Sequence, residues 1–140
     1  MKFKALLASL ALSTVAASTH AGDPKVPSQD RKAIIAGLRA HPSFGHLQDM
    51  KLDVRRIWVS PQLAYLCALP IGKDKRYAQT DGMFDVVQVA FRREGERWVP
   101  TARVDGLSET LKQVQCMAPP DGEITEAFVE ALVNNPGLRP

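Results

Sequence analysis

The chain has 140 residues, with 18 Lys and Arg side chains against 15 Asp and Glu, and hydrophobic residues make up 45% of it. This length predicts one domain, and the ordinary composition without internal repeats is typical of a globular protein. A nucleic-acid binder normally carries a strong basic excess on one face. The near balance of charges therefore argues against nucleic acid as a partner.

The N-terminus has the pattern of a secretory signal peptide. Lys2 and Lys4 precede a chargeless, mostly apolar run, ALLASLALSTVAA, and the small residues Thr19 and Ala21 suit cleavage after Ala21. Cleavage after Ser18 is the alternative, and an apolar N-terminal helix of a cytosolic protein is the competing interpretation. A bilayer span needs about 20 apolar residues, more than this run or any later one provides. We expect a periplasmic or secreted protein without a membrane span.

Export would change both the charge and the length that matter for folding. Loss of residues 1–21 removes two lysines and no acid, which brings the net charge to about +1. The remaining chain of about 120 residues is long enough to bury its own core. We expect a flexible lead-in at residues 22–27 and a single domain at residues 28–140.

Hydrophobic periodicity predicts an α+β domain. A helix is expected from Ser28 to Pro42, with apolar residues at helical spacing and Gly37 as a weak helix former inside it. Four strands are expected next, at residues 51–60, 63–69, 83–93 and 98–104. Two helical segments, at residues 107–115 and 121–134, are expected to end the chain. The short connections imply an antiparallel sheet with the helices covering one face.

Three of the predicted strands have irregular or distinctive residue patterns, and one long polar loop lies between them. The alternation of apolar residues slips at Arg55 and Arg56, which indicates a β-bulge or a twisted strand. Both faces of strand 63–69 are apolar, as is typical of a central strand. Pro100 indicates an edge strand or a bulge, because proline cannot donate to a central ladder. The polar loop at residues 72–82 is either a solvated connection or a binding surface.

The two cysteines, Cys67 and Cys116, are expected to form a disulfide, because exported chains with two cysteines most often pair them. Two separate buried thiols are the alternative. A zinc site needs about four ligands at suitable spacing, and besides the cysteines the mature chain offers only His41 and His46. We therefore expect no metal and no cofactor.

Catalytic groups are weakly indicated. Asp81 and Asp85 flank a strand start and could act as an acid–base pair, but turn formation explains the Asp81-Gly82 dipeptide well and is the favoured interpretation. Several arginines are expected on or beside the strands, where they form either a positive surface or cross-strand ion pairs. These are Arg55, Arg56, Arg92, Arg93, Arg97 and Arg103.

Three stretches carry a resemblance to known proteins: DRKAIIAGLR, VRRIWVSPQLAYLCAL and DGMFDVVQVAFRREGERWVP. Together they resemble a pattern of small exported proteobacterial proteins of uncharacterised function. The resemblance spans Asp30 to Pro100 and implies a periplasmic α+β domain, with no catalytic residues to transfer. The two cysteines are not a feature of that pattern.

These observations favour an exported, non-enzymatic domain that binds a protein or another partner in the cell envelope, as an inhibitor or immunity-type protein would. The alternative is a carrier of a small apolar ligand, with a pocket between sheet and helices lined by Tyr65, Phe91 and Trp98. The same three aromatic residues would also suit a filled core. An enzyme is the third hypothesis, and it requires Asp81 or Asp85 to meet a histidine. The sequence does not indicate an oligomeric state.

Overall fold

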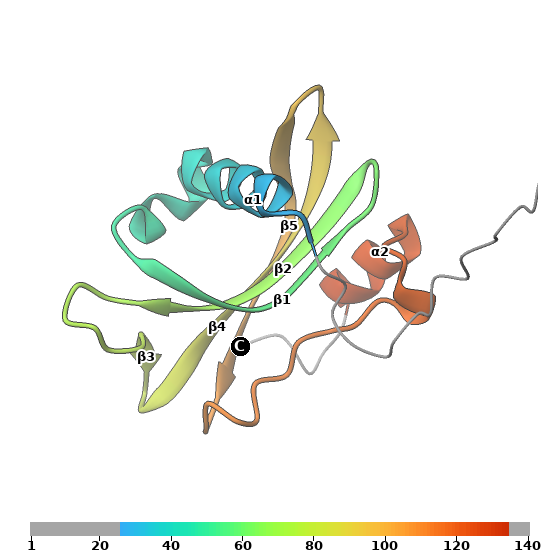
Figure 1. Cartoon of the computed structure of the whole chain (residues 1–140). Helices are drawn as coiled ribbons and strands as arrows, with labels where there is room; N and C mark the ends of the chain where they lie inside the picture. The colour runs from blue at the N-terminus through green and yellow to red at the C-terminus, as the bar shows by residue number, and fades with distance from the viewer. Residues whose placement is uncertain (1–25, 135–140) are drawn as a thin grey trace, which may run out of the picture.

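The computed structural model describes residues 26–134. The predicted signal peptide, most of the predicted lead-in and residues 135–140 lie outside the described residues. The elements in chain order are α1 (Ser28–Ala40), the 3-10 helix η1 (Pro42–Leu47), β1 (Lys51–Val59), β2 (Leu63–Ile71), β3 (Gln79–Thr80), β4 (Met83–Glu94), β5 (Arg97–Ser108), the 3-10 helix η2 (Pro120–Gly122) and α2 (Glu126–Asn134). The predicted α+β class is confirmed (Figure 1).

All strand pairs of the five-stranded sheet are antiparallel. The strands lie in the order β1, β2, β4 and β5, and the short β3 pairs with the first residues of β4. The four predicted strands are all present. The fifth, β3, lies in the polar loop at residues 72–82, and its two residues are too few to show a hydrophobic period.

Both predicted irregularities of the sheet are confirmed. The register of β1 against β2 shifts between Val54 and Arg56, so Arg55 is the extra residue of a β-bulge. The register of β5 against β4 shifts beside Pro100, where Thr101 is the extra residue of β5. Among the described residues β5 pairs only with β4, which places Pro100 on an edge strand.

The prediction that helices cover one face of the sheet is wrong, because both faces are covered. Helices α1 and η1 pack on one face and bury a cluster that includes Ile34, Leu66 and Phe91. Helix α2 packs on the other face, in a cluster with Tyr65 and Phe128 (Figure 1). The cause is already visible in β2, whose residues are apolar on both faces and therefore need two covering layers.

The predicted helix at residues 107–115 is also wrong, while the last predicted helix is confirmed as α2. Strand β5 continues through Ser108, which pairs with Phe84, and residues 109–119 form turns and bends without a helix or a strand. The helical propensity of this segment is only weak. Its tertiary contacts with the sheet therefore decide its conformation.

Helix α1 crosses β5 at Gly37. A Cβ atom at this position would overlap the carbonyl oxygen of Trp98 and lie 3.0 Å from the carbonyl carbon. Glycine therefore permits a close approach of two backbones, which explains its presence in the middle of a helix.

Candidate functional site

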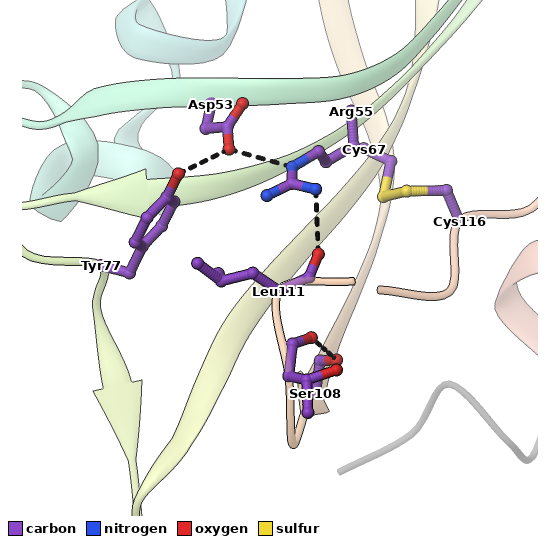
Figure 2. A network of polar contacts seen from close by, with 8 residues as sticks. Asp53, Arg55, Cys67, Tyr77, Ser108, Leu111 and Cys116 are labelled. Carbon is purple, nitrogen blue, oxygen red and sulfur yellow. Dashed lines mark hydrogen bonds and ion pairs between the residues drawn. A yellow bond between two sulfur atoms is a disulfide. The ribbon is translucent and has the colours of Figure 1, made fainter. Parts of the chain in front are cut away.

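The most distinctive feature of the molecule is the irregular segment between β5 and α2, residues 109–125, here called the strap. Its partly buried side chains Val114, Cys116 and Met117 pack on the sheet face opposite α1. Three sets of contacts fasten it to the strands, and Figure 2 shows two of them. The contacts involve Leu111, Cys116 and Met117 of the strap.

The first attachment is a polar clamp built on β1. Asp53 accepts two hydrogen bonds at Oδ2, from Arg55 Nε and from the Tyr77 hydroxyl, each 2.9 Å long. Arg55 also donates through Nη1 to the Leu111 carbonyl oxygen, 3.0 Å away (Figure 2). The bulge places Arg55 where its side chain reaches both partners. The clamp thus joins β1, the segment before β3 and the strap.

The second attachment is the disulfide between Cys67 and Cys116, which confirms the predicted pairing. The two Cα atoms lie 5.9 Å apart, an ordinary separation for a disulfide. Cys67 lies in β2 and is fully buried, whereas Cys116 on the strap is only partly buried. The bond links the middle of the inner strand β2 to the middle of the strap.

The third attachment is a buried polar cluster beneath the strap. The Tyr65 hydroxyl donates to Gln88 Oε1 over 2.5 Å. The backbone N–H of Met117 donates to the Tyr65 oxygen over 3.0 Å and is 3.3 Å from Gln88 Oε1. Both side chains are fully buried, and Gln88 Nε2 has no hydrogen-bond partner among the described residues. The apolar pattern of β4 predicts no role for Gln88, although a single amide side chain among the valines of this strand is an indication of a buried polar contact.

Removing the Tyr65 hydroxyl should destabilise the protein. Tyr65→Phe keeps the ring and its edge-on contact with Phe128, at 5.3 Å between centroids, but removes a buried hydrogen bond to Gln88. We expect the free energy of unfolding to fall by about 1–2 kcal/mol, because the buried Gln88 Oε1 loses the shorter of its two hydrogen bonds. Urea denaturation measures the change. An unchanged midpoint would show that the cluster does not contribute to stability.

The clamp should contribute less, because its members are partly exposed. Asp53 and Arg55 retain 29% and 31% of their side-chain exposure. Tyr77→Phe removes one of the two donors to Asp53, and we expect a loss of about 1 kcal/mol after solvent screening is taken into account. Lys73→Met is the control, since its ion pair with Asp49 is 3.8 Å long and about four-fifths exposed. Equal losses in the two variants, measured by urea denaturation, would contradict this ranking.

The three predicted pocket residues do not lie together. Tyr65 belongs to the cluster beneath the strap and α2. Phe91 and Trp98 belong to the cluster beneath α1, on the opposite face of the sheet. All three are buried in these clusters, as core residues are. The three side chains therefore do not line one common pocket.

The groups considered for catalysis serve local structure. Asp81 and Gly82 both have positive φ, 51° and 80°, and form the tight turn between β3 and β4. His41 accepts a hydrogen bond at Nδ1 from the Ser43 N–H and lies edge-on to Phe44. Asp85 lies in β4, where its backbone N–H donates to the Ala78 carbonyl oxygen over 2.9 Å.

Several predicted strand arginines have individual partners instead of forming one open positive surface. Arg92 pairs with Glu126 of α2, and Arg103 pairs with Asp105. Arg93 lies over the ring of Trp98, 5.5 Å from its centroid. Together with Arg55 in the clamp, these contacts favour the interpretation of the arginines as pairing residues.

Within residues 26–134 there is no group of three or more His, Cys, Asp and Glu side chains that could hold a metal ion. No helix in that range combines the length and the apolar character required to cross a membrane. Comparisons with protein-family models, curated proteins and solved structures find no match to this chain.

Proposed function

We propose that this protein is an exported, non-enzymatic domain that binds a protein partner in the cell envelope through the outer surface of the strap. One observation carries the proposal. The strap is anchored at Leu111, Cys116 and Met117, while all the side chains between these anchors except Val114 are exposed. The exposed residues between the anchors are Lys112, Gln113 and Gln115.

An anchored irregular segment suits recognition of a protein. Irregular segments held by a rigid scaffold commonly carry binding residues, because their side chains are not committed to a ladder or a helix face. A disulfide that fixes the backbone before binding reduces the entropy lost on association. Here the scaffold is a sheet covered on both faces, and the anchors lie at Leu111 and at the adjacent residues Cys116 and Met117.

The proposed location rests on the disulfide and the N-terminal sequence. Disulfides persist in oxidising compartments such as the periplasm and the extracellular medium. The bond between Cys67 and Cys116 supports such a compartment. An inhibitor or immunity-type role is the form of partner binding that a small, covalently fastened domain would suit.

Affinity capture from an envelope extract of the source organism tests the proposal, with the oxidised mature protein, residues 22–140, as bait. We expect one protein at near-equal stoichiometry. The strap variant Lys112→Ala/Gln113→Ala/Gln115→Ala should lose it, because exposed side chains contribute to binding and little to folding. The control variant Glu94→Ala/Glu96→Ala/Arg97→Ala, in the exposed β4–β5 hairpin, should retain it.

Each other outcome of this capture counts against a stated part of the proposal. Equal capture by the strap variant would move the binding surface elsewhere on the molecule. Failure to capture any protein with bait shown to be folded and oxidised would contradict partner binding itself.

A further inference from the structure

The two cysteines of the disulfide differ in exposure. Cys67 is fully buried in β2, and Cys116 is partly exposed on the strap. Thiol–disulfide exchange requires an external thiolate to reach one sulfur while the other departs as a thiolate. Access therefore selects Sγ of Cys116 as the attacked atom and Sγ of Cys67 as the leaving atom.

The surroundings of Cys67 suit a departing thiolate. Arg56 of β1 and Gln88 of β4 lie directly opposite Cys67, one on each side. Directly opposed residues share one face, with Cβ atoms about 5 Å apart. A neighbouring arginine stabilises a thiolate by its charge. Gln88 Nε2 is a buried donor without a partner among the described residues, so a thiolate formed beside it would supply a missing acceptor.

The strap is held more weakly than the rest of the molecule once the disulfide is open. Its remaining polar attachments to the strands include the hydrogen bonds at Thr110, Leu111 and Met117, each of modest net strength. The sheet and α1 share a separate buried cluster to which the strap contributes no residue. Segments with few buried contacts and no ladder open locally at lower free energy than the core.

We propose that the disulfide between Cys67 and Cys116 is a redox latch, whose reduction by a dithiol releases the strap while the sheet and α1 stay folded. The reductant's thiolate attacks Sγ of Cys116, forms a mixed disulfide and releases Cys67 as a thiolate. The second thiol of the reductant then displaces Cys116 and closes the reductant's own disulfide. Two electrons and two protons pass from the dithiol to the protein. This inference does not depend on partner binding by the strap.

Amide hydrogen exchange of the full mature protein, with and without dithiothreitol, tests the release. The Met117 amide is the reporter, because it donates to Tyr65 and Gln88 only while the strap is closed. We expect its exchange to accelerate at least about tenfold on reduction, with the β2–β4 amides changed less than about twofold. Cys67→Ala/Cys116→Ala should behave like the reduced protein without any reductant. Unchanged protection of Met117, or equal loss of protection throughout the sheet, would overturn the proposal.

The direction of attack is tested with glutathione at low conversion, followed by peptide mass spectrometry. The mixed disulfide is expected on Cys116, with Cys67 as the free thiol. Arg56→Gln should slow reduction by dithiothreitol about threefold or more, because the leaving thiolate loses a nearby positive charge. Arg97→Gln, at the exposed hairpin, is the control and should leave the rate unchanged. Glutathione found mainly on Cys67, or equal rates in both variants, would overturn the assigned roles of the two sulfurs.

Discussion

Replacing Gly37 with alanine is expected to lower the free energy of unfolding by about 3 kcal/mol. The new Cβ would overlap the carbonyl oxygen of Trp98 and lie 3.0 Å from the carbonyl carbon. Both atoms are backbone, so a side-chain rotation cannot relieve the overlap, and α1 must move away from β5. Alanine in an uncrowded helix would instead stabilise the protein by about 1 kcal/mol. The sign of the change therefore reports the close approach directly.

Gly45→Ala is the matched control for this measurement. Gly45 lies in η1, and a Cβ built there meets no atom within 4 Å. We expect its stability to stay within about 0.5 kcal/mol of the unmodified protein. Both variants are compared by urea denaturation at equal disulfide content. A Gly37→Ala protein as stable as the control would mean that the two layers are not in close contact at Trp98.

The sequence predicts the sheet well, because each irregularity of the sheet is marked by a residue at that same position in the strand. The slip of apolar parity at Arg55 identifies the β1 bulge, and Pro100 identifies the edge strand with its own irregularity. The disulfide follows from cysteine count and the N-terminal pattern, and the structure confirms it. The bulge and the edge strand depend on the backbone properties of single residues, and the disulfide depends on the reactivity of the two thiols.

The strap was not predictable from periodicity. Its conformation depends on Leu111, Cys116 and Met117 meeting partners about 30 to 55 residues earlier in the chain, as the separations of 56, 49, 52 and 29 residues show. A local pattern carries no information about such contacts, so the weak helical signal at residues 107–115 was misleading. Gln88 was missed for the same reason, since its partners lie in β2 and the strap.

Whether the predicted pocket residues lie on the same face of the sheet depends on the register of the strands. Tyr65 of β2 pairs with Ala90 of β4, so the next residue, Phe91, must point to the opposite face. Periodicity groups the residues of one strand into two faces but does not say which face of one strand matches which face of another. Only the register separates Tyr65 from Phe91 and Trp98.

Removing the disulfide by Cys67→Ala/Cys116→Ala is expected to lower the free energy of unfolding by about 4 kcal/mol. The sequence separation of the two cysteines is 49 residues, and closing a loop of about 50 residues removes that much conformational entropy from the unfolded chain. Because the effect acts mainly on the unfolded state, that state becomes more extended in the variant and exposes more surface. The dependence of stability on denaturant concentration, the m-value, should therefore increase. Guanidinium denaturation at constant temperature measures both quantities.

The reduced, unmodified protein is the control that separates the covalent bond from the side chains. Alanine at position 67 also removes a buried sulfur from the cluster beneath the strap, and this costs about 1 kcal/mol whether or not a bond was present. We therefore expect the reduced protein to lose slightly less stability than the double variant and to show the same increase in m-value. A small loss with an unchanged m-value would mean that the oxidised and reduced unfolded chains are equally compact.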